Sequence, residues 1–209
     1  IATSAGQFVR MFNGANTPLL FNGSSWSTTA ITGSGLTASN LIWGNLHQSR
    51  LWVGEKDSLS AYYLAVNNVS GAATEFPLGG VASKGGFIQA MGTWTRDSGA
   101  GADDVAVFVT SEGEAIVYKG TDPSSVSTWS LVGVFQIGKP IGRRCLVKAG
   151  SDLILMTQDG FVPLSGILSL DRSQASLVAL SDQISKAVND AVRSYGDIFG
   201  WQPILYPKG

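Results

Sequence analysis

Short apolar runs bounded by turn residues dominate the first 165 positions of the chain. The run 104–110 (DVAVFVT) is followed by Glu112-Gly113 and then by 114–119 (EAIVYK). Apolar strands joined by a short glycine-containing turn are typical of β-hairpins, because glycine adopts the positive φ that tight turns need. At least ten candidate strands precede residue 170, among them the runs 7–12, 51–54, 59–65, 152–157 and 161–164.

The predicted turns recur along the chain. They fall near residues 14, 56, 113 and 160, with another at Lys208-Gly209, so the spacing is irregular but roughly fifty residues. Units of about 40–50 residues with about four strands each are typical of β-propeller blades. We therefore predict an all-β fold, a β-propeller-like arc of four-stranded blades over residues 1–170 with one helical insertion. Because rings usually contain about four to eight blades, and the sequence begins with Ile1, we expect a fragment of a longer chain.

The helical insertion is predicted at 171–196. From Leu177 to Tyr195, apolar residues recur at spacings of three and four, which is helical periodicity. Ser173 or Ser181 can cap the N-terminus of this helix, and Gly196 can end it in the left-handed conformation. Since only one face is apolar, we expect it to pack against the side of its own sheet; a partner subunit is the alternative.

Residues 197–209 are predicted to start a further strand or blade. The run Trp201–Tyr206 (WQPILY) is apolar, and Pro203 makes a central strand position unfavourable because proline has no N–H to donate.

Charge is scarce in this sequence. Only 14% of residues are charged and the formal net charge is -1, which argues against a generally basic nucleic-acid binder. Two interpretations of the low charge stay open: an uncharged polar surface, or a surface covered by other subunits. No apolar run is long enough to span a membrane, so no membrane insertion is expected from this segment.

The sequence offers few candidates for catalysis or metal binding. His47 is the single histidine, and we interpret it as a structural residue. Cys145 follows Arg143 and Arg144, which would lower its pKa if the thiol faced them; along a strand, Arg144 would point away from Cys145 and Arg143 would lie beside it. We favour a buried, inert Cys145.

Carboxylates also do not converge in the sequence. The loop from Asp97 to Asp104 holds several of them and could bind Ca²⁺, but its spacing does not match an EF-hand loop, so we expect a solvated turn. The other carboxylates near turns are expected to be solvated: Glu55, Asp57, Glu75, Glu112 and Glu114. We predict no catalytic, cofactor-binding or metal-binding residues, no cofactor and no enzymatic activity, since no nucleophile or phosphate-binding motif is present.

Four runs carry a resemblance to a known family: 55–64 (EKDSLSAYYL), 71–80 (GAATEFPLGG), 111–140 (SEGEAIVYKGTDPSSVSTWSLVGVFQIGKP) and 152–165 (DLILMTQDGFVPLS). The chain resembles the β-propeller part of short-tailed phage tail proteins of the nozzle or tail-tubular type, often grouped with DNA-stabilisation proteins. The resemblance implies a structural virion protein in the phage tail, made in the cytoplasm of the bacterial host. It also implies a homo-oligomeric ring, usually of six copies, that contacts other tail or portal proteins around a channel for transient DNA.

Two other functions compete with this one. The first alternative is a carbohydrate-binding or glycan-cleaving propeller of a tail or secreted protein, which paired carboxylates under exposed tryptophans would favour. The second is a host repeat scaffold that binds peptides on a propeller face.

Overall fold

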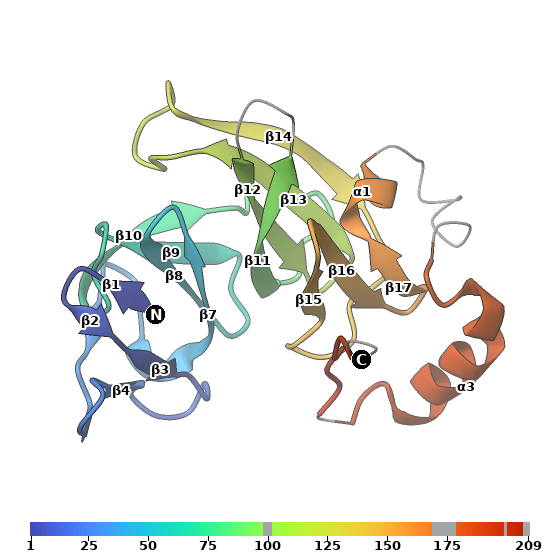
Figure 1. Ribbon diagram of the computed structural model, residues 1–209, viewed down its shortest axis with the longest axis horizontal. Helices are drawn as coiled ribbons and strands as arrows, with labels where there is room; N and C mark the ends of the chain where they lie inside the picture. Colours follow the sequence, from blue (N-terminus) through green and yellow to red (C-terminus); the bar gives the residue numbers. More distant parts are fainter. Residues whose placement is uncertain (98–101, 169–178, 199, 207–209) are drawn as a thin grey trace.

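Strands dominate the protein. The computed structural model describes residues 1–97, 102–168, 179–198 and 200–206 (Figure 1). Strands make up 45% and helices 10% of the structure, so the prediction of an all-β fold is confirmed.

The strands are short and the helices few in the described residues. The strands are β1 (Ala2–Thr3), β2 (Gly6–Gln7), β3 (Val9–Met11), β4 (Leu19–Phe21), β5 (Trp26–Ser27), β6 (Ile31–Thr32), β7 (Leu41–His47), β8 (Arg50–Glu55), β9 (Ser60–Leu64), β10 (Gly71–Pro77), β11 (Ile88–Asp97), β12 (Ala102–Thr110), β13 (Glu114–Gly120), β14 (Trp129–Gln136), β15 (Leu146–Ala149), β16 (Asp152–Thr157) and β17 (Gly160–Pro163). The helices are α1 (Leu164–Ile167) and α3 (Ser185–Tyr195), with 3-10 turns η1 (Ala38–Asn40) and η3 (Asp182–Ile184).

Four antiparallel meanders follow one another along the chain. The first sheet has the order β3-β4-β5, the second β7-β8-β9-β10, the third β11-β12-β13-β14 and the fourth β15-β16-β17. β6 adds a parallel strand to the outer edge of the second sheet, and β1 and β2 form a separate hairpin. The second and third meanders therefore have the four strands that we predicted, whereas the first and fourth have three.

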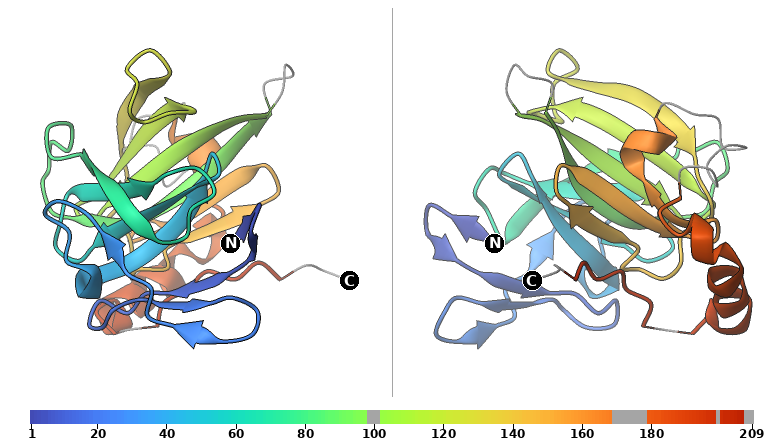
Figure 2. Two further views of the ribbon diagram at one scale, coloured as in Figure 1. Left: turned by 90° about the vertical axis from the view of Figure 1, so that its left-hand side faces the viewer. Right: turned by 45° about the vertical axis from the view of Figure 1, so that its right-hand side comes forward.

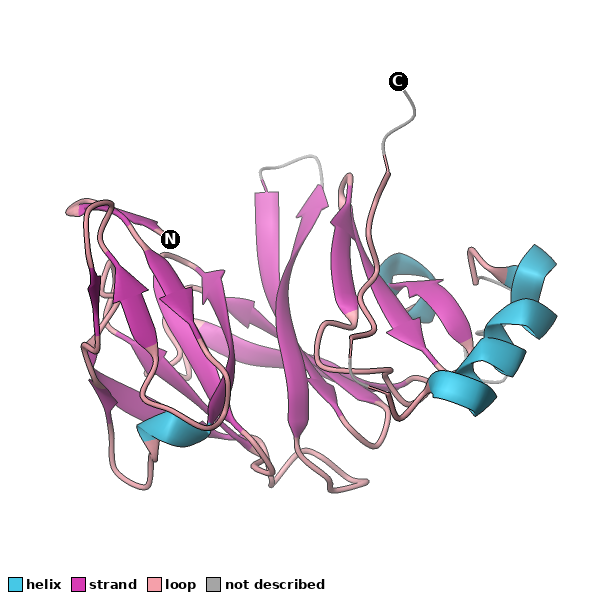
Figure 3. Ribbon diagram, turned by 90° about the horizontal axis from the view of Figure 1, so that it is seen from below, coloured by secondary structure: helices cyan, strands magenta, loops and turns pink. Residues whose placement is uncertain are grey.

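The sheets are arranged in chain order across the molecule (Figure 3), and β11 of the third sheet contacts both β7 of the second and β15 of the fourth. The indole N–H of Trp43 on β7 donates to the carbonyl oxygen of Ile88 on β11, at 3.1 Å. The indole N–H of Trp94 on β11 donates to the carbonyl oxygen of Ser151, beside β16, at 2.9 Å. Two tryptophans thus join the second sheet to the third and the third to the fourth.

One backbone hydrogen bond repeats in three of the meanders. In each, the turn between the second and third strands donates an N–H to the chain that enters the first strand. The three pairs are Lys56 N to Asn40 O (2.9 Å), Ser111 N to Phe87 O (2.8 Å) and Gln158 N to Lys139 O (2.9 Å). This repetition matches the predicted recurrence of turns near 56, 113 and 160. The turn at 14 instead lies in a longer loop between β3 and β4, and Lys208-Gly209 lies outside the described residues.

Neighbouring sheets bury apolar side chains between them. β12 shows this best, since alternate residues point to opposite faces of a strand. Its Phe108 belongs to the core between the second and third sheets, together with Trp52 and Trp129. Its Val107 belongs to the core between the third and fourth sheets, together with Leu155. Burial on both faces explains why this run of the sequence is apolar throughout rather than alternating.

The helix α3 begins later in the chain than we predicted. The start of the predicted 171–196 insertion, including Ser173, lies outside the described residues. Within the described part, the 3-10 turn η3 comes first and α3 begins at Ser185. Gly196 is right-handed, with φ -57, and donates its N–H to Val192 O at 2.8 Å, so the predicted left-handed ending is wrong. Figure 2 shows α3 (red) at the outer end of the fourth sheet.

Only part of the apolar stripe of this helix meets the fourth sheet. Val192 packs against the core of the third and fourth sheets, whereas Tyr195 is exposed, as are Leu180 and Ile184, which belong to the predicted stripe but precede α3. The expected packing against the protein's own sheet is therefore incomplete.

Ser181 does not cap the helix; it completes the edge of the fourth sheet. Its Oγ accepts the N–H of Phe161 on β17 at 3.1 Å, and the N–H of Leu180 donates to Phe161 O at 2.8 Å. The segment 179–181 thus covers the edge where a fourth strand would pair, and a serine hydroxyl replaces one backbone acceptor.

The predicted strand at 201–206 is not formed. This segment has no strand assignment, and its side chains at Ile204, Leu205 and Tyr206 are exposed. Pro203 has no N–H to donate, which weakens pairing at its centre. The indole N–H of Trp201 donates to Tyr195 O at 2.7 Å and holds the start of the segment against the end of α3.

Candidate functional site

A groove of about 770 Å³ lies where the sheets meet, and we call it the central groove. Its walls come from the loop after β3, from β7 and β11, from the turn before β15, and from residues 196–198 and 200–202. Because each sheet supplies at most three of these residues, the groove exists only when the meanders are packed side by side. Its volume lies within the range of small-molecule sites, roughly 300–1,000 Å³.

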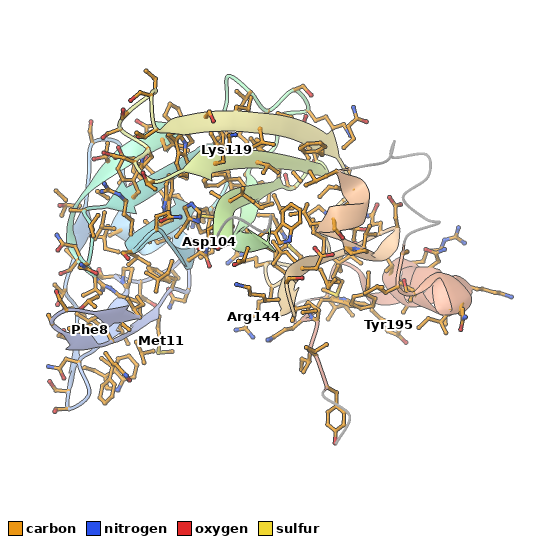
Figure 4. All side chains as sticks on the ribbon, turned by 45° about the horizontal axis from the view of Figure 1, so that its top comes forward. Phe8, Met11, Asp104, Lys119, Arg144 and Tyr195 are labelled. Carbon is orange, nitrogen blue, oxygen red and sulfur yellow. The ribbon has the colours of Figure 1, made fainter. Side chains whose placement is uncertain are left out.

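Two exposed arginines line the central groove. Arg143 and Arg144 both lie in the turn before β15. The Nη1 of Arg144 donates to Gln202 Oε1 at 3.0 Å. Figure 4 shows Arg144 and Met11 on the same side of the molecule, below the sheets in that view.

Arg143 reaches the opposite wall. A Cβ placed on Gly14, in the loop after β3, would lie 3.6 Å from Nη1 of Arg143. The amine of Lys56 also donates to Gly14 O, at 3.3 Å. From the sequence we considered Arg143 and Arg144 only as neighbours of Cys145. The pair itself was a signal that we missed, because two adjacent cations in a chain with few charges are candidate ligand contacts.

The basic surface continues along β15. A smaller hollow of about 370 Å³ shares Met91 and Leu146 with the central groove and is also lined by Lys148. The amine of Lys148 donates to Thr95 Oγ1 at 3.0 Å. Leu146 and Lys148 of β15 point to the same face of the strand, and this face carries the hollow from the central groove to Lys148.

Cys145 points away from this face and is buried in the core of the third and fourth sheets. Burial raises the pKa of its thiol to about 12. The prediction of a buried, inert cysteine is thus supported by its surroundings. The placement of Arg143 beside Cys145 is wrong, because both arginines lie in a turn before strand alternation begins.

His47 lies between the second and third sheets, with 2% of its surface exposed. Its Nδ1 is 3.3 Å from Thr93 Oγ1, and its ring meets Trp129 edge to face at 5.6 Å. Burial lowers the pKa of His47 from 6.5 to about 4, against a smaller raising effect of Asp104. This contact between sheets agrees with a structural residue.

Two of the five carboxylates that we expected to be solvated are buried. Glu114 Oε1 accepts Ser83 N at 3.1 Å and the Ser83 hydroxyl at 2.5 Å, and its Oε2 accepts Lys84 N at 3.1 Å. Glu55 Oε1 accepts Thr37 N at 2.8 Å. Each holds the loop that leads into the first strand of its own meander, so backbone N–H groups replace water as the partners of the carboxylate.

The remaining turn carboxylates are less buried. Asp57 and Glu75 are exposed, as expected, and Glu112 is partly exposed and pairs with Lys139 Nζ at 2.6 Å.

The acidic loop from Asp97 to Asp104 is only partly described, since residues 98–101 and the side chains of Asp97 and Asp103 lie outside the description. Asp104 Oδ1 accepts the hydroxyl of Thr95 at 2.6 Å, within the β11–β12 hairpin. Within the described part of the chain, no three His, Cys, Asp or Glu side chains are grouped as metal ligands. The interpretation of this loop as a solvated turn stays a prediction.

Comparison with known proteins gives no relative: the chain matches no family model and no curated protein. The resemblance to phage tail proteins therefore stays a prediction, as does the expected lack of enzymatic activity. In the ranges that the structure describes, no helix is long and apolar enough to cross a membrane.

Proposed function

We propose that this protein is a structural component of a phage tail, in which the four meanders form an arc of a β-propeller. The observation that supports this most is the serial packing of the last three meanders, whose first strands β7, β11 and β15 are neighbours and which repeat the hydrogen bond between turn and strand entry. Propeller blades are antiparallel sheets of about four strands that pack face to face around an axis. The second and third meanders, with buried cores on both faces, have this character.

The proposed assembly is a homo-oligomeric ring, of about six copies by the resemblance, in contact with other tail or portal proteins. A ring needs head-to-tail contacts between two different surfaces. Exposed apolar residues favour two surfaces: Leu131 and Val132 on β14, the outer strand of the third sheet, and Ile184 and Tyr195 at the two ends of α3. Apolar and aromatic residues with little charge are typical of interface centres.

The proposed ring surrounds a channel that DNA crosses transiently. The net charge of -1 suits such a wall, because every phosphate that a protein neutralises adds affinity and would slow passage. The proposed location is the tail of the virion, after synthesis in the bacterial host cytoplasm.

Electron microscopy tests this function directly. Phage particles, and portal complexes incubated with the purified protein, should show it as a closed ring on the tail axis. Absence from the tail, or a position on its periphery without ring symmetry, would contradict the proposal.

A further inference from the structure

The cations of the central groove lack carboxylate partners in the structure. In the described part of the chain, the ion pairs join Arg50 to Asp122 and Lys139 to Glu112, so neither Arg143 nor Arg144 is neutralised by one. Asp197 is the carboxylate among the described lining residues. The groove therefore carries a local excess of positive charge in a chain whose net charge is -1.

The same groove offers apolar and amide surfaces. Trp201 lies against the turn of the arginines: a Cβ on Gly142 would lie 3.3 Å from Cβ of Trp201. Phe12 and Met91 line the walls, and Asn13 and Gln202 add amide side chains to the lining residues. Guanidinium groups bind carboxylates through paired N–H donors, while amides and ring faces match the hydroxyl groups and C–H faces of a sugar.

We propose that the central groove binds an acidic glycan, with a sugar carboxylate held by the guanidinium groups of Arg143 and Arg144. A second acidic unit of a linear glycan would extend toward Lys148, along the hollow that continues the groove. This binding does not depend on the proposed position of the protein in a tail.

Charge favours this ligand over a nucleic acid. A nucleic acid carries a phosphate on every nucleotide and gains affinity from many simultaneous cation contacts. The groove and its continuation offer Arg143, Arg144 and Lys148, and the chain as a whole is slightly acidic. Three cations match a short acidic oligosaccharide, such as a trimer with one carboxylate per sugar, better than a long polyanion whose affinity comes from many contacts.

Calorimetric titration of the purified protein tests the proposal with matched probes. The probes are linear trimers of galacturonate and of sialic acid, each beside its methyl ester, which keeps the sugar and removes the charge. We expect at least one acid form to bind, its ester to bind at least about tenfold more weakly, and added salt to weaken the acid form.

Variants then assign the binding to the groove. Arg143→Ala and Arg144→Ala should each weaken binding about tenfold, the usual effect of losing a hydrogen bond to a charged group. Asp197→Asn should tighten it about twofold, because it removes a like charge from the groove. Lys186→Gln is the matched control, since it removes an exposed cation from α3, outside the groove, and should change nothing.

Four results would overturn the proposal. The first is that neither acid trimer binds, and the second is that acid and ester bind equally well. The third is that both arginine variants bind as tightly as wild type while their unfolding curves match it. The fourth is displacement of the trimer by inorganic phosphate at the same concentration, which would mean a simple anion site. Tighter binding of a single-stranded oligonucleotide or an acidic peptide, lost in the same variants, would assign the groove to that ligand instead.

Discussion

His47 shows how burial sets the behaviour of a single side chain. Its ring lies between the second and third sheets, where burial lowers its pKa from 6.5 to about 4. The fold therefore favours the neutral imidazole, and between these pH values the unfolded chain binds more protons than the folded one. Stability is then complete above pH 6.5 and falls as the pH drops toward 4.

We predict that replacing His47 by Gln removes part of the acid sensitivity of the protein. The shift from 6.5 to about 4 corresponds to about 3 kcal/mol of unfolding free energy, at about 1.4 kcal/mol per pKa unit. Urea unfolding at several pH values should show a smaller loss between pH 6.5 and 4 in His47→Gln than in wild type. Equal losses in the two proteins would mean that carboxylates alone cause the acid sensitivity.

Glu114 should contribute more to stability than its neighbour Glu112. Both of its oxygens accept hydrogen bonds from the loop at Ser83 and Lys84, whereas Glu112 pairs with Lys139 at the surface. Glu114→Gln leaves one oxygen to accept and turns an N–H₂ group toward a backbone donor, so we expect a loss of about 1.5–3 kcal/mol. Glu112→Gln is the control, with an expected loss of about 0–1 kcal/mol. Chemical denaturation measures both, and similar losses would contradict the buried role of Glu114.

At the scale of the element, the hairpins were the part that the sequence predicted best. Turns near 56, 113 and 160 depend on local backbone chemistry, which the residues specify directly. The start of the helix was predicted less well, because the Oγ of Ser181 accepts the N–H of Phe161 on β17, a contact between residues 20 positions apart. Similarly, 201–206 has the composition of a strand, but no strand edge among the described residues pairs with it.

Two glycines with positive φ provide a test of the hairpin geometry. Gly120 (φ +131) joins β13 to the loop before β14, and a Cβ there would collide with Thr128 O, whereas a Cβ on Gly71 (φ +98) would meet nothing within 4 Å. We expect Gly71→Ala to cost about 1–2 kcal/mol from backbone strain alone. Gly120→Ala should cost about 1–3 kcal/mol more, because the backbone must move. Thermal unfolding of the two variants checks this, and equal losses would show that the strand β14 relaxes freely.

At the scale of the whole molecule, the central groove could not be predicted from the sequence. Its walls come from the loop after β3, from β7 and β11, and from the turn before β15, parts of the chain separated by up to a hundred or more positions. Periodicity indicates which residues of a strand share a face, but not which sheets become neighbours. The buried Glu55 and Glu114 were missed for a related reason: the loops that cover them lead into the first strand of the same meander, 18 and 31 positions away, and periodicity does not reveal such contacts either.

The last prediction concerns assembly. Leu131 and Val132 on the outer strand β14 are 43% and 40% exposed. If β14 is one of the ring contacts, a charged residue there should weaken assembly, because interface centres are poor in charge. The stability of the isolated protein should not change, since both side chains are exposed in it. We expect Leu131→Glu with Val132→Lys to lower the amount of protein that co-sediments with portal complexes, with an unchanged unfolding curve. Val126→Glu is the matched control, since Val126 is 98% exposed in the loop before β14. Normal co-sedimentation of the double variant would exclude β14 as a contact and leave the surface of α3 as the remaining candidate.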